Sequence, residues 1–236
     1  MTDNLIDLGK LYHDYSIFGI HNHQLDGLYK LNQKSKEPII RAYMQYAIAK
    51  CRSSVCTPVN FVELFCADGY YAMLARHLGA TFSTGIDNNK DGHFFKAEKI
   101  AERLGINNIE FILEDINEID NMHSYDIVAN VGGLYHVENP KEILVKSYSM
   151  ARKYLIIQSV VSLSNHDENY LEIPAPGWSW GNRMNPVSFH KMILDLDYQI
   201  VDFHLNELEG NGRIEDRGSV YYLIKVEPEK NKEVQR

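Results

Sequence analysis

The fold is decided by the stretch VNFVELFCADGYYA, residues 59–72. It begins with an apolar run, continues through a turn of small residues, and ends in residues that favour a helix. In a strand–turn–helix unit of this kind, backbone N–H groups of the turn and the helix N-terminus face a ligand. The stretch therefore predicts a ligand-binding turn.

Strands and helices alternate after this stretch. Alternation of this kind predicts a doubly wound α/β fold with a parallel sheet, right-handed crossovers, and a ligand site beyond the carboxyl ends of the strands. We expect strands at 59–65, 81–86, 109–113, 125–131, 154–161, 198–205 and 220–226, and helices at 70–78, 97–104, 188–196 and from Pro140 onward.

Polar residues end three successive strands. Asp87 ends the second expected strand, Asp115 the third and Asn130 the fourth. A carboxylate at Asp87 can accept both hydroxyls of an adenosine ribose, and one at Asp115 could accept an adenine amino group. The alternative for each aspartate is a turn or helix cap. Their joint occurrence after the small-residue turn favours the ligand site.

With these residues, the sequence resembles the class I S-adenosylmethionine (SAM)-dependent methyltransferases over residues 59–163. The first motif of that family is acid-x-Gly-x-Gly-x-Gly. Here Glu63 and Gly69 are kept, while Phe65 and Ala67 replace two glycines. The missing second glycine counts against a dinucleotide, whose pyrophosphate needs close backbone approach. SAM has no phosphate and tolerates Ala67.

The resemblance implies a Rossmann-like, mostly parallel seven-stranded sheet with an antiparallel last strand, and SAM as the cofactor. The turn would surround the methionine part of SAM, and the ends of the next two strands would hold ribose and adenine. The cofactor-binding residues so implied are Glu63, Phe65, Cys66, Ala67, Gly69, Asp87, Asn88, Asp115, Ile116 and Asn130.

A second pattern follows the fourth strand. Leu134-Tyr135-His136, with Pro140 four residues on, resembles methyltransferases of small molecules and of some modified tRNA wobble bases. An acceptor hydroxyl or protonated amine must lose a proton, and histidine suits that role. We expect His136 to be this base or to orient the acceptor, and Tyr135 to line the methyl channel. The alternative is that His136 only caps or packs the following helix.

The connection at residues 162–185 is long for a compact domain, and long loops are often functional. It carries both tryptophans of the chain. Trp178 and Trp180 could stack on a sugar or ring, and Arg183 could bind a carboxylate or phosphate bidentately. The alternative is a loop pinned to the core by its tryptophans.

Residues 1–58 are expected to form an N-terminal helical lid over residues 59–227, the SAM-binding domain, with 228–236 as a charged tail. Helices are predicted at 5–12 and from Pro38 through Ile48. The aromatic and histidine residues between them could close over the acceptor, pack the lid on the domain, or make a homodimer contact. They are Tyr12, Tyr15, Phe18, His21, His23 and Tyr29, with Tyr15 predicted to touch substrate and no metal expected.

Composition narrows the functional class. The 236 residues carry a net charge of −8, which disfavours nonspecific nucleic-acid binding. Three cysteines without a framework and no visible signal peptide favour a reduced, cytoplasmic protein. Residues 130–133, Asn-Val-Gly-Gly, lack the motif of DNA amino-methylating enzymes, and no Pro-Cys nucleophile occurs.

The sequence thus predicts methyl transfer from SAM to oxygen or nitrogen of a small metabolite. The connection at residues 162–185, called the tryptophan loop below, suggests a sugar-like acceptor. Rival functions are a tRNA-modifying methyltransferase, a non-catalytic SAM-binding module and a nicotinamide-dependent dehydrogenase.

Overall fold

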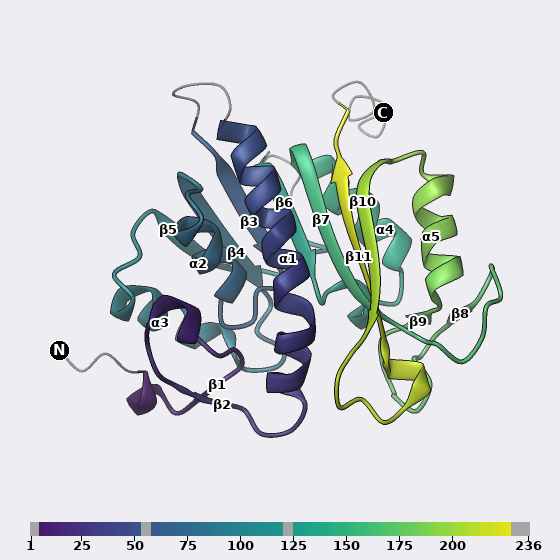
Figure 1. Ribbon diagram of the computed structural model, residues 1–236, viewed down its shortest axis with the longest axis horizontal. Helices are drawn as coiled ribbons and strands as arrows, with labels where there is room; N and C mark the ends of the chain where they lie inside the picture. Colours follow the sequence, from purple (N-terminus) through teal and green to yellow (C-terminus); the bar gives the residue numbers. More distant parts are fainter. Residues whose placement is uncertain (1–4, 53–57, 120–124, 228–236) are drawn as a thin grey trace.

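A seven-stranded sheet forms the centre of the molecule (Figure 1). The structure, a computed structural model, describes residues 5–52, 58–119 and 125–227. The strand order is β10-β11-β7-β6-β3-β4-β5, and β11 alone runs opposite to the other strands of this sheet. The strands are β3 (Asn60–Leu64), β4 (Phe82–Asp87), β5 (Ile109–Leu113), β6 (Tyr125–Val131), β7 (Ala151–Val161), β10 (Gln199–Glu207) and β11 (Gly218–Lys225). The predicted Rossmann-like sheet with one antiparallel strand is confirmed.

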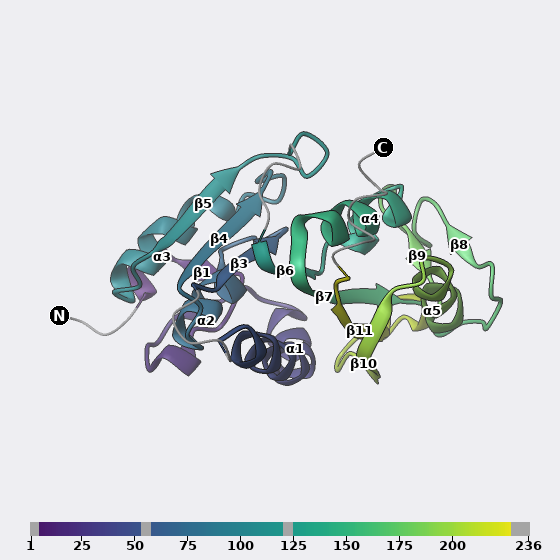
Figure 2. The same ribbon diagram turned by 90° about the horizontal axis from the view of Figure 1, so that it is seen from above.

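Helices cover both faces of the sheet (Figure 2). One face carries α1 (Tyr29–Arg52), α2 (Tyr70–His77) and α3 (Ala97–Arg103), and the other carries α4 (Pro140–Met150) and α5 (Pro186–Asp195). Strand β6 serves both cores, because Ile127 packs on the α1 face and Val128 on the α4 face. A strand that is buried on both faces is mostly apolar. Burying each of its large apolar side chains contributes about 1.5–3 kcal/mol to stability.

The first long helix differs from its prediction. Helix α1 begins at Tyr29 and contains Pro38 internally, so the predicted start at Pro38 is wrong. The early turns of α1 lack a continuous apolar stripe and are held instead by Gln33, which accepts a hydrogen bond from the Asp14 backbone N–H (2.8 Å). Proline leaves the carbonyl of Lys34 without its helical donor, a local cost that the surrounding packing offsets.

The predicted helix at 5–12 is also wrong. Only a 3-10 turn, η1 (Ile6–Leu8), forms before Gly9, whose φ of +73° breaks the helix. The chain then enters β1 (Lys10–Leu11), which pairs in parallel with β2 (His23–Gln24). The backbone of β1, which local periodicity assigned to a helix, is therefore hydrogen-bonded to β2, a segment more than ten residues further along the chain. The 3-10 helix η2 (Ser16–Phe18) lies between these strands.

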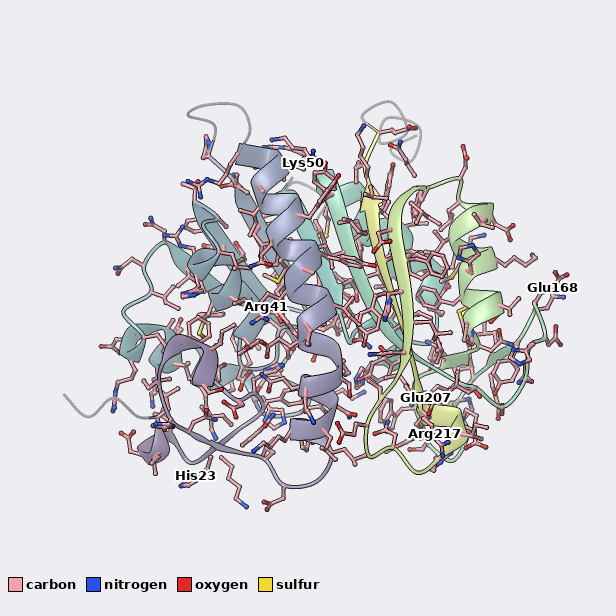
Figure 3. The ribbon with its side chains drawn as sticks, in the orientation of Figure 1. His23, Arg41, Lys50, Glu168, Glu207 and Arg217 are labelled. Carbon is pink, nitrogen blue, oxygen red and sulfur yellow. The ribbon has the colours of Figure 1, made fainter. Side chains whose placement is uncertain are left out.

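The long connection at 162–185 folds into two short strands, β8 (Leu171–Glu172) and β9 (Arg183–Met184). Its tip projects from the molecule, as the outward Glu168 shows (Figure 3). The remaining 3-10 helices are η3 (Phe94–Lys96), η4 (Leu134–His136) and η5 (Ile214–Asp216). The predicted tail at 228–236 lies outside the described residues. Across the described ranges, no helix has the length and apolar character needed to cross a membrane.

Candidate active site

A cavity of about 1160 Å³ opens at the carboxyl ends of the parallel strands. Phe65 and Ala67 line it just after β3, and Val131 lines it at the end of β6. Between β3 and β6 the winding of the sheet reverses, which is where open α/β sheets bind ligands. The sheet topology therefore places this cavity at the position expected for a substrate and cofactor.

The turn after β3 keeps a glycine-like backbone without the glycines. Phe65, Ala67 and Gly69 have φ values of 60°, 49° and 80°, all in the left-handed region. This conformation is strained for residues with a Cβ, above all for a bulky one. Strain of this kind clusters at ligand sites, where the surrounding structure enforces it. The ring of Phe65 packs against Gly133, where an added Cβ would lie 2.0 Å from it.

Glu63 sits beneath the turn and is almost fully buried. Its carboxylate accepts a hydrogen bond from the Ala72 N–H (2.8 Å) and so satisfies one free donor of the first turn of α2. Burial raises the pKa of Glu63, and the Ala72 N–H opposes the rise. Glu63 lines the cavity, so the structure gives it a capping role together with access to a ligand.

The ends of β4 and β5 hold a linked polar rim. Asp87 accepts hydrogen bonds from the N–H groups of Ala67 (3.0 Å) and Asn89 (2.6 Å). Burial raises the pKa of Asp87. Asn88 donates to Asp115 (2.8 Å), whose pKa is lowered chiefly by the Asn117 N–H. Asp87, Asn88, Asp115 and Ile116 all line the cavity, so the structure brings these four predicted residues together.

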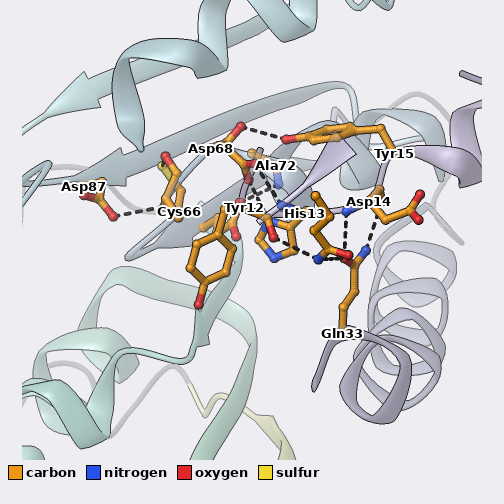
Figure 4. Close-up of polar contacts among 12 residues, drawn as sticks. Tyr12, His13, Asp14, Tyr15, Gln33, Cys66, Asp68, Ala72 and Asp87 are labelled. Atoms are coloured by element: carbon orange, nitrogen blue, oxygen red, sulfur yellow. Dashed lines mark hydrogen bonds and ion pairs between the residues drawn. The ribbon is translucent and has the colours of Figure 1, made fainter. Parts of the chain in front are cut away.

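The N-terminal segment contributes to the cavity wall and adds a residue, His13, that the sequence analysis did not single out (Figure 4). His13 binds Asp68 twice, through its backbone N–H (3.0 Å) and through Nδ1 (2.6 Å). Tyr15 donates its hydroxyl to the Asp68 carbonyl (3.0 Å). Asp68 is almost fully buried, and His13 holds the pKa of its carboxyl below the usual value against the effect of burial. Tyr12 and His13 both line the cavity.

Helix η4 brings Tyr135 and His136 to the opposite wall. The imidazole of His136 stacks on the indole of Trp180, with centroids 4.9 Å apart and planes 4° from parallel. Burial lowers the pKa of His136 to about 4, which keeps the ring neutral near pH 7. Burial also raises the pKa of Tyr135 to about 12, and the Arg183 guanidinium lies 5.2 Å from the centre of its ring.

The tryptophan loop, residues 162–185, is held to η4 by hydrogen bonds that Asn182 donates to backbone carbonyls. Asn182 donates from Nδ2 to the carbonyls of Leu134 and Val137, each at 2.7 Å, and its N–H bonds the Tyr135 carbonyl (3.0 Å). Gly181 has a φ of +68°, and an added Cβ would lie 2.4 Å from that carbonyl. These contacts set two segments, far apart in sequence, side by side at the cavity.

Arg183 is largely engaged within the protein. It is 3 % exposed, and its Nε and NH2 groups each lie 2.8 Å from Asp216 Oδ1. Trp178 also donates to Asp216 (3.3 Å). Both tryptophans and Arg183 line the cavity, but Asp216 already pairs with the Arg183 guanidinium that we expected to bind a substrate anion.

Four predicted residues do not reach the cavity wall. Tyr15 is fully buried against Asp68. Cys66 is buried, and burial raises the pKa of its thiol, so it acts as a packing residue. Gly69 is enclosed by Phe111, and Asn130 donates to Ser147 (3.0 Å) beneath α4.

Sequence reasoning missed two polar residues on the acceptor side. Lys36 is half-buried on α1, and its ammonium group makes no ion pair or hydrogen bond with any described residue; burial lowers its pKa to about 8. Gln158 is fully buried on β7, and its Oε1 lacks a partner among the described residues. Neither lies in a recognisable motif, because each reaches the cavity only through packing of α1 and β7.

Comparison with known proteins agrees with this geometry. A methyltransferase-domain family model matches residues 58–196, and the chain belongs to that family. The predicted class, a class I methyltransferase with SAM as cofactor, is thereby confirmed. No curated protein matches the sequence at a significant level.

Solved structures share the fold at low identity. Magnesium protoporphyrin IX methyltransferase from Synechocystis PCC 6803, with bound S-adenosylhomocysteine (SAH), is 14% identical with a TM-score of 0.64, over 86% of this chain and 89% of that one. The N-terminal domain of EvdMO1 with SAH is 15% identical with a TM-score of 0.64, over 94% and 93%. Coclaurine N-methyltransferase, bound to N-methylheliamine and SAH, is 11% identical with a TM-score of 0.58, over 79% and 72%.

Proposed function

We propose that this methyltransferase transfers the SAM methyl group to an oxygen or nitrogen of a small-molecule acceptor held between η4, α1 and the tryptophan loop. The observation that carries the proposal is a single cavity whose cofactor wall carries Asp87 and Asp115 while its other wall carries Tyr135, His136 and Trp180. Similar folds in coclaurine N-methyltransferase and magnesium protoporphyrin IX methyltransferase support a small acceptor.

SAM fits the cofactor wall. Its ribose would meet the carboxylate of Asp87, its adenine would lie by Asp115 and Ile116, and its amino-acid part would reach the left-handed turn near Ala67. When bound, SAM supplies an activated methyl group, which is the difficult part of the chemistry. The protein's task is alignment of donor and acceptor, which can contribute about 7–11 kcal/mol.

His136 is the proposed base or orienting residue for the acceptor. Its neutral ring can accept a proton at pH 7, and stacking on Trp180 fixes the ring plane. A pKa of about 4 makes it a weak base, so the proposal favours orientation of the acceptor together with proton acceptance late in transfer. His136→Ala is expected to keep SAH affinity while lowering turnover about 10²-fold or more.

The acceptor is proposed to be ring-shaped or sugar-like and to carry an anionic group. Trp178 is 45% exposed beside the cavity and offers a stacking surface. Because Asp216 occupies Arg183, the unpaired Lys36 is the better candidate for the anion. Gln158 Oε1 is free to accept a hydrogen bond from the acceptor. It lies near the Tyr135 hydroxyl, because a Cβ added at Gly132 would be 3.8 Å from that oxygen and 3.9 Å from the hydroxyl.

The decisive experiment incubates the protein with cell extract and SAM carrying an isotopically labelled methyl group. Mass spectrometry should find a small metabolite that gains the label, and the same extract with the His136→Ala protein should not. Label in tRNA, or formation of no labelled product together with no SAH, would contradict the proposal.

A further inference from the structure

His13 and Asp68 form a buried hydrogen-bonded pair that the proposed chemistry leaves without a role. Asp68 belongs to the cofactor turn, and His13 belongs to the N-terminal segment between β1 and β2. A buried carboxylate is tolerated only when paired and hydrogen-bonded. Asp68 receives both the N–H and Nδ1 of His13, and it in turn fixes which way the ring faces.

Aromatic contacts hold the imidazole rigidly. Tyr70 stacks on it at 4.7 Å with planes 19° apart, Tyr71 meets it edge-on at 5.6 Å, and Tyr12 lies at 4.8 Å. With Nδ1 committed to Asp68, the other ring nitrogen, Nε2, has no hydrogen-bond partner among the described residues. His13 lines the cavity beside the turn (Figure 4). Nε2 is therefore the free nitrogen of a ring whose other nitrogen is hydrogen-bonded to Asp68, and an imidazole that lies between two carboxylates can donate to both.

The charges on the cofactor wall identify the ligand group. Glu63, Asp87 and Asp115 are carboxyl groups, which suit the ammonium, the ribose hydroxyls and the adenine amine of SAM. SAM also carries one carboxylate, which none of these acids can bind. Asp68 holds the His13 ring next to the turn with its second nitrogen free, whereas Lys90, also on this wall, is an exposed side chain.

We infer that Nε2 of His13 binds the carboxylate of the methionine part of SAM, with Asp68 as the positioning residue. The inference rests on the proposed placement of SAM in this cavity. It links the N-terminal segment to the cofactor, because the same histidine joins the chain between β1 and β2 to Asp68 in the turn after β3.

Two substitutions separate the nitrogens of the ring. His13→Asn keeps a donor near the position of Nδ1, for Asp68, and removes Nε2; His13→Gln keeps a neutral donor near Nε2. Calorimetric titration uses four ligands: SAM and SAH, which carry the carboxylate, and decarboxylated SAM and 5′-methylthioadenosine, which lack it. We expect His13→Asn to weaken SAM and SAH at least tenfold and the other two less than twofold. His13→Gln should retain part of the affinity.

Other outcomes overturn the inference. Equal weakening of all four ligands would mean a purely structural role, and equal weakening of SAM and decarboxylated SAM would assign His13 to the ammonium. Unchanged SAM affinity with lost turnover would place His13 at the acceptor. If the unsubstituted protein binds none of the four ligands, the proposed function itself fails, and a thermal melt of each variant confirms that it is folded.

Discussion

The rings of His136 and Trp180 lie parallel at 4.9 Å, which joins the short η4 helix to the tryptophan loop. One ring follows β6 and the other lies in the long connection after β7. The stack buries one face of the imidazole and lowers its proton affinity, because the charged form loses hydration. Acceptor chemistry and loop position are therefore coupled through one contact.

His136 should make stability depend on pH. Its pKa is about 4 in the folded protein and about 6.5 in the unfolded chain. The unfolded state therefore binds the proton more readily, so the contribution is fully present above about pH 6.5 and is lost as pH falls toward about 4. His136→Phe keeps a ring against Trp180 and should flatten this slope in urea titrations between pH 4 and 7. His166→Phe, on the exposed loop, should leave the slope as it is; equal slopes in all three proteins would contradict the assignment.

Asp87→Ala should weaken SAH binding at least tenfold. A lost charged hydrogen-bond acceptor costs about 1.5–3 kcal/mol. Calorimetric titration measures the dissociation constant, with the exposed Glu168→Ala as control. Because Asp87 also holds the Ala67 N–H, the melting temperature of each variant is recorded. An unchanged dissociation constant would move the ribose contact elsewhere.

Ala67→Gly should stabilise the fold by about 0.5–1 kcal/mol. A left-handed backbone costs a residue with a Cβ about 1–2 kcal/mol, which the added chain entropy of glycine only partly offsets. The matched control is Ala101→Gly in α3, a right-handed helical position, where destabilisation of about 1 kcal/mol is expected. Urea unfolding measures both, and a loss at both positions would show that the turn is unstrained.

Lys36→Met should raise the KM for the acceptor about tenfold or more and leave the SAH dissociation constant unchanged. The lysine faces the cavity and has no internal partner in the described part of the chain. Lys34→Met is the matched control, because Lys34 lies on the same helix but pairs with the exposed Glu209. Steady-state kinetics with the acceptor found in extract tests this. Equal KM values for both variants would remove Lys36 from the acceptor site.

Asn182→Ala should release the tryptophan loop from η4. Two carbonyls lose their donor, which costs about 1–3 kcal/mol. Both tryptophans of the chain lie in this loop, so a red shift of intrinsic fluorescence reports its release. Asn169→Ala, at the exposed tip of the same connection, should change neither fluorescence nor stability. An unshifted spectrum for Asn182→Ala would mean that the His136–Trp180 stack alone holds the loop.

The sequence by itself determined the alternation of strands and helices and the rim formed by Asp87 and Asp115. These follow from local patterns, because apolar periodicity sets the elements and parallel strands end at one edge. The start of α1 and the conformation of residues 5–12 could not be predicted from local patterns. They depend on contacts between distant segments, namely the hydrogen bond from Asp14 to Gln33 and the pairing of β1 with β2.

Tertiary structure alone decided which other polar side chains share the cavity with Asp87 and Asp115. In the folded protein His13 is hydrogen-bonded to Asp68, and Arg183 is paired with Asp216. Lys36 has no ion-pair partner among the described residues, and Tyr15 is buried in the core. Each of these outcomes depends on which polar or charged groups are brought within hydrogen-bonding distance when the chain folds. That pairing is settled by packing of segments up to 55 residues apart, as for His13 and Asp68, and no local pattern encodes it.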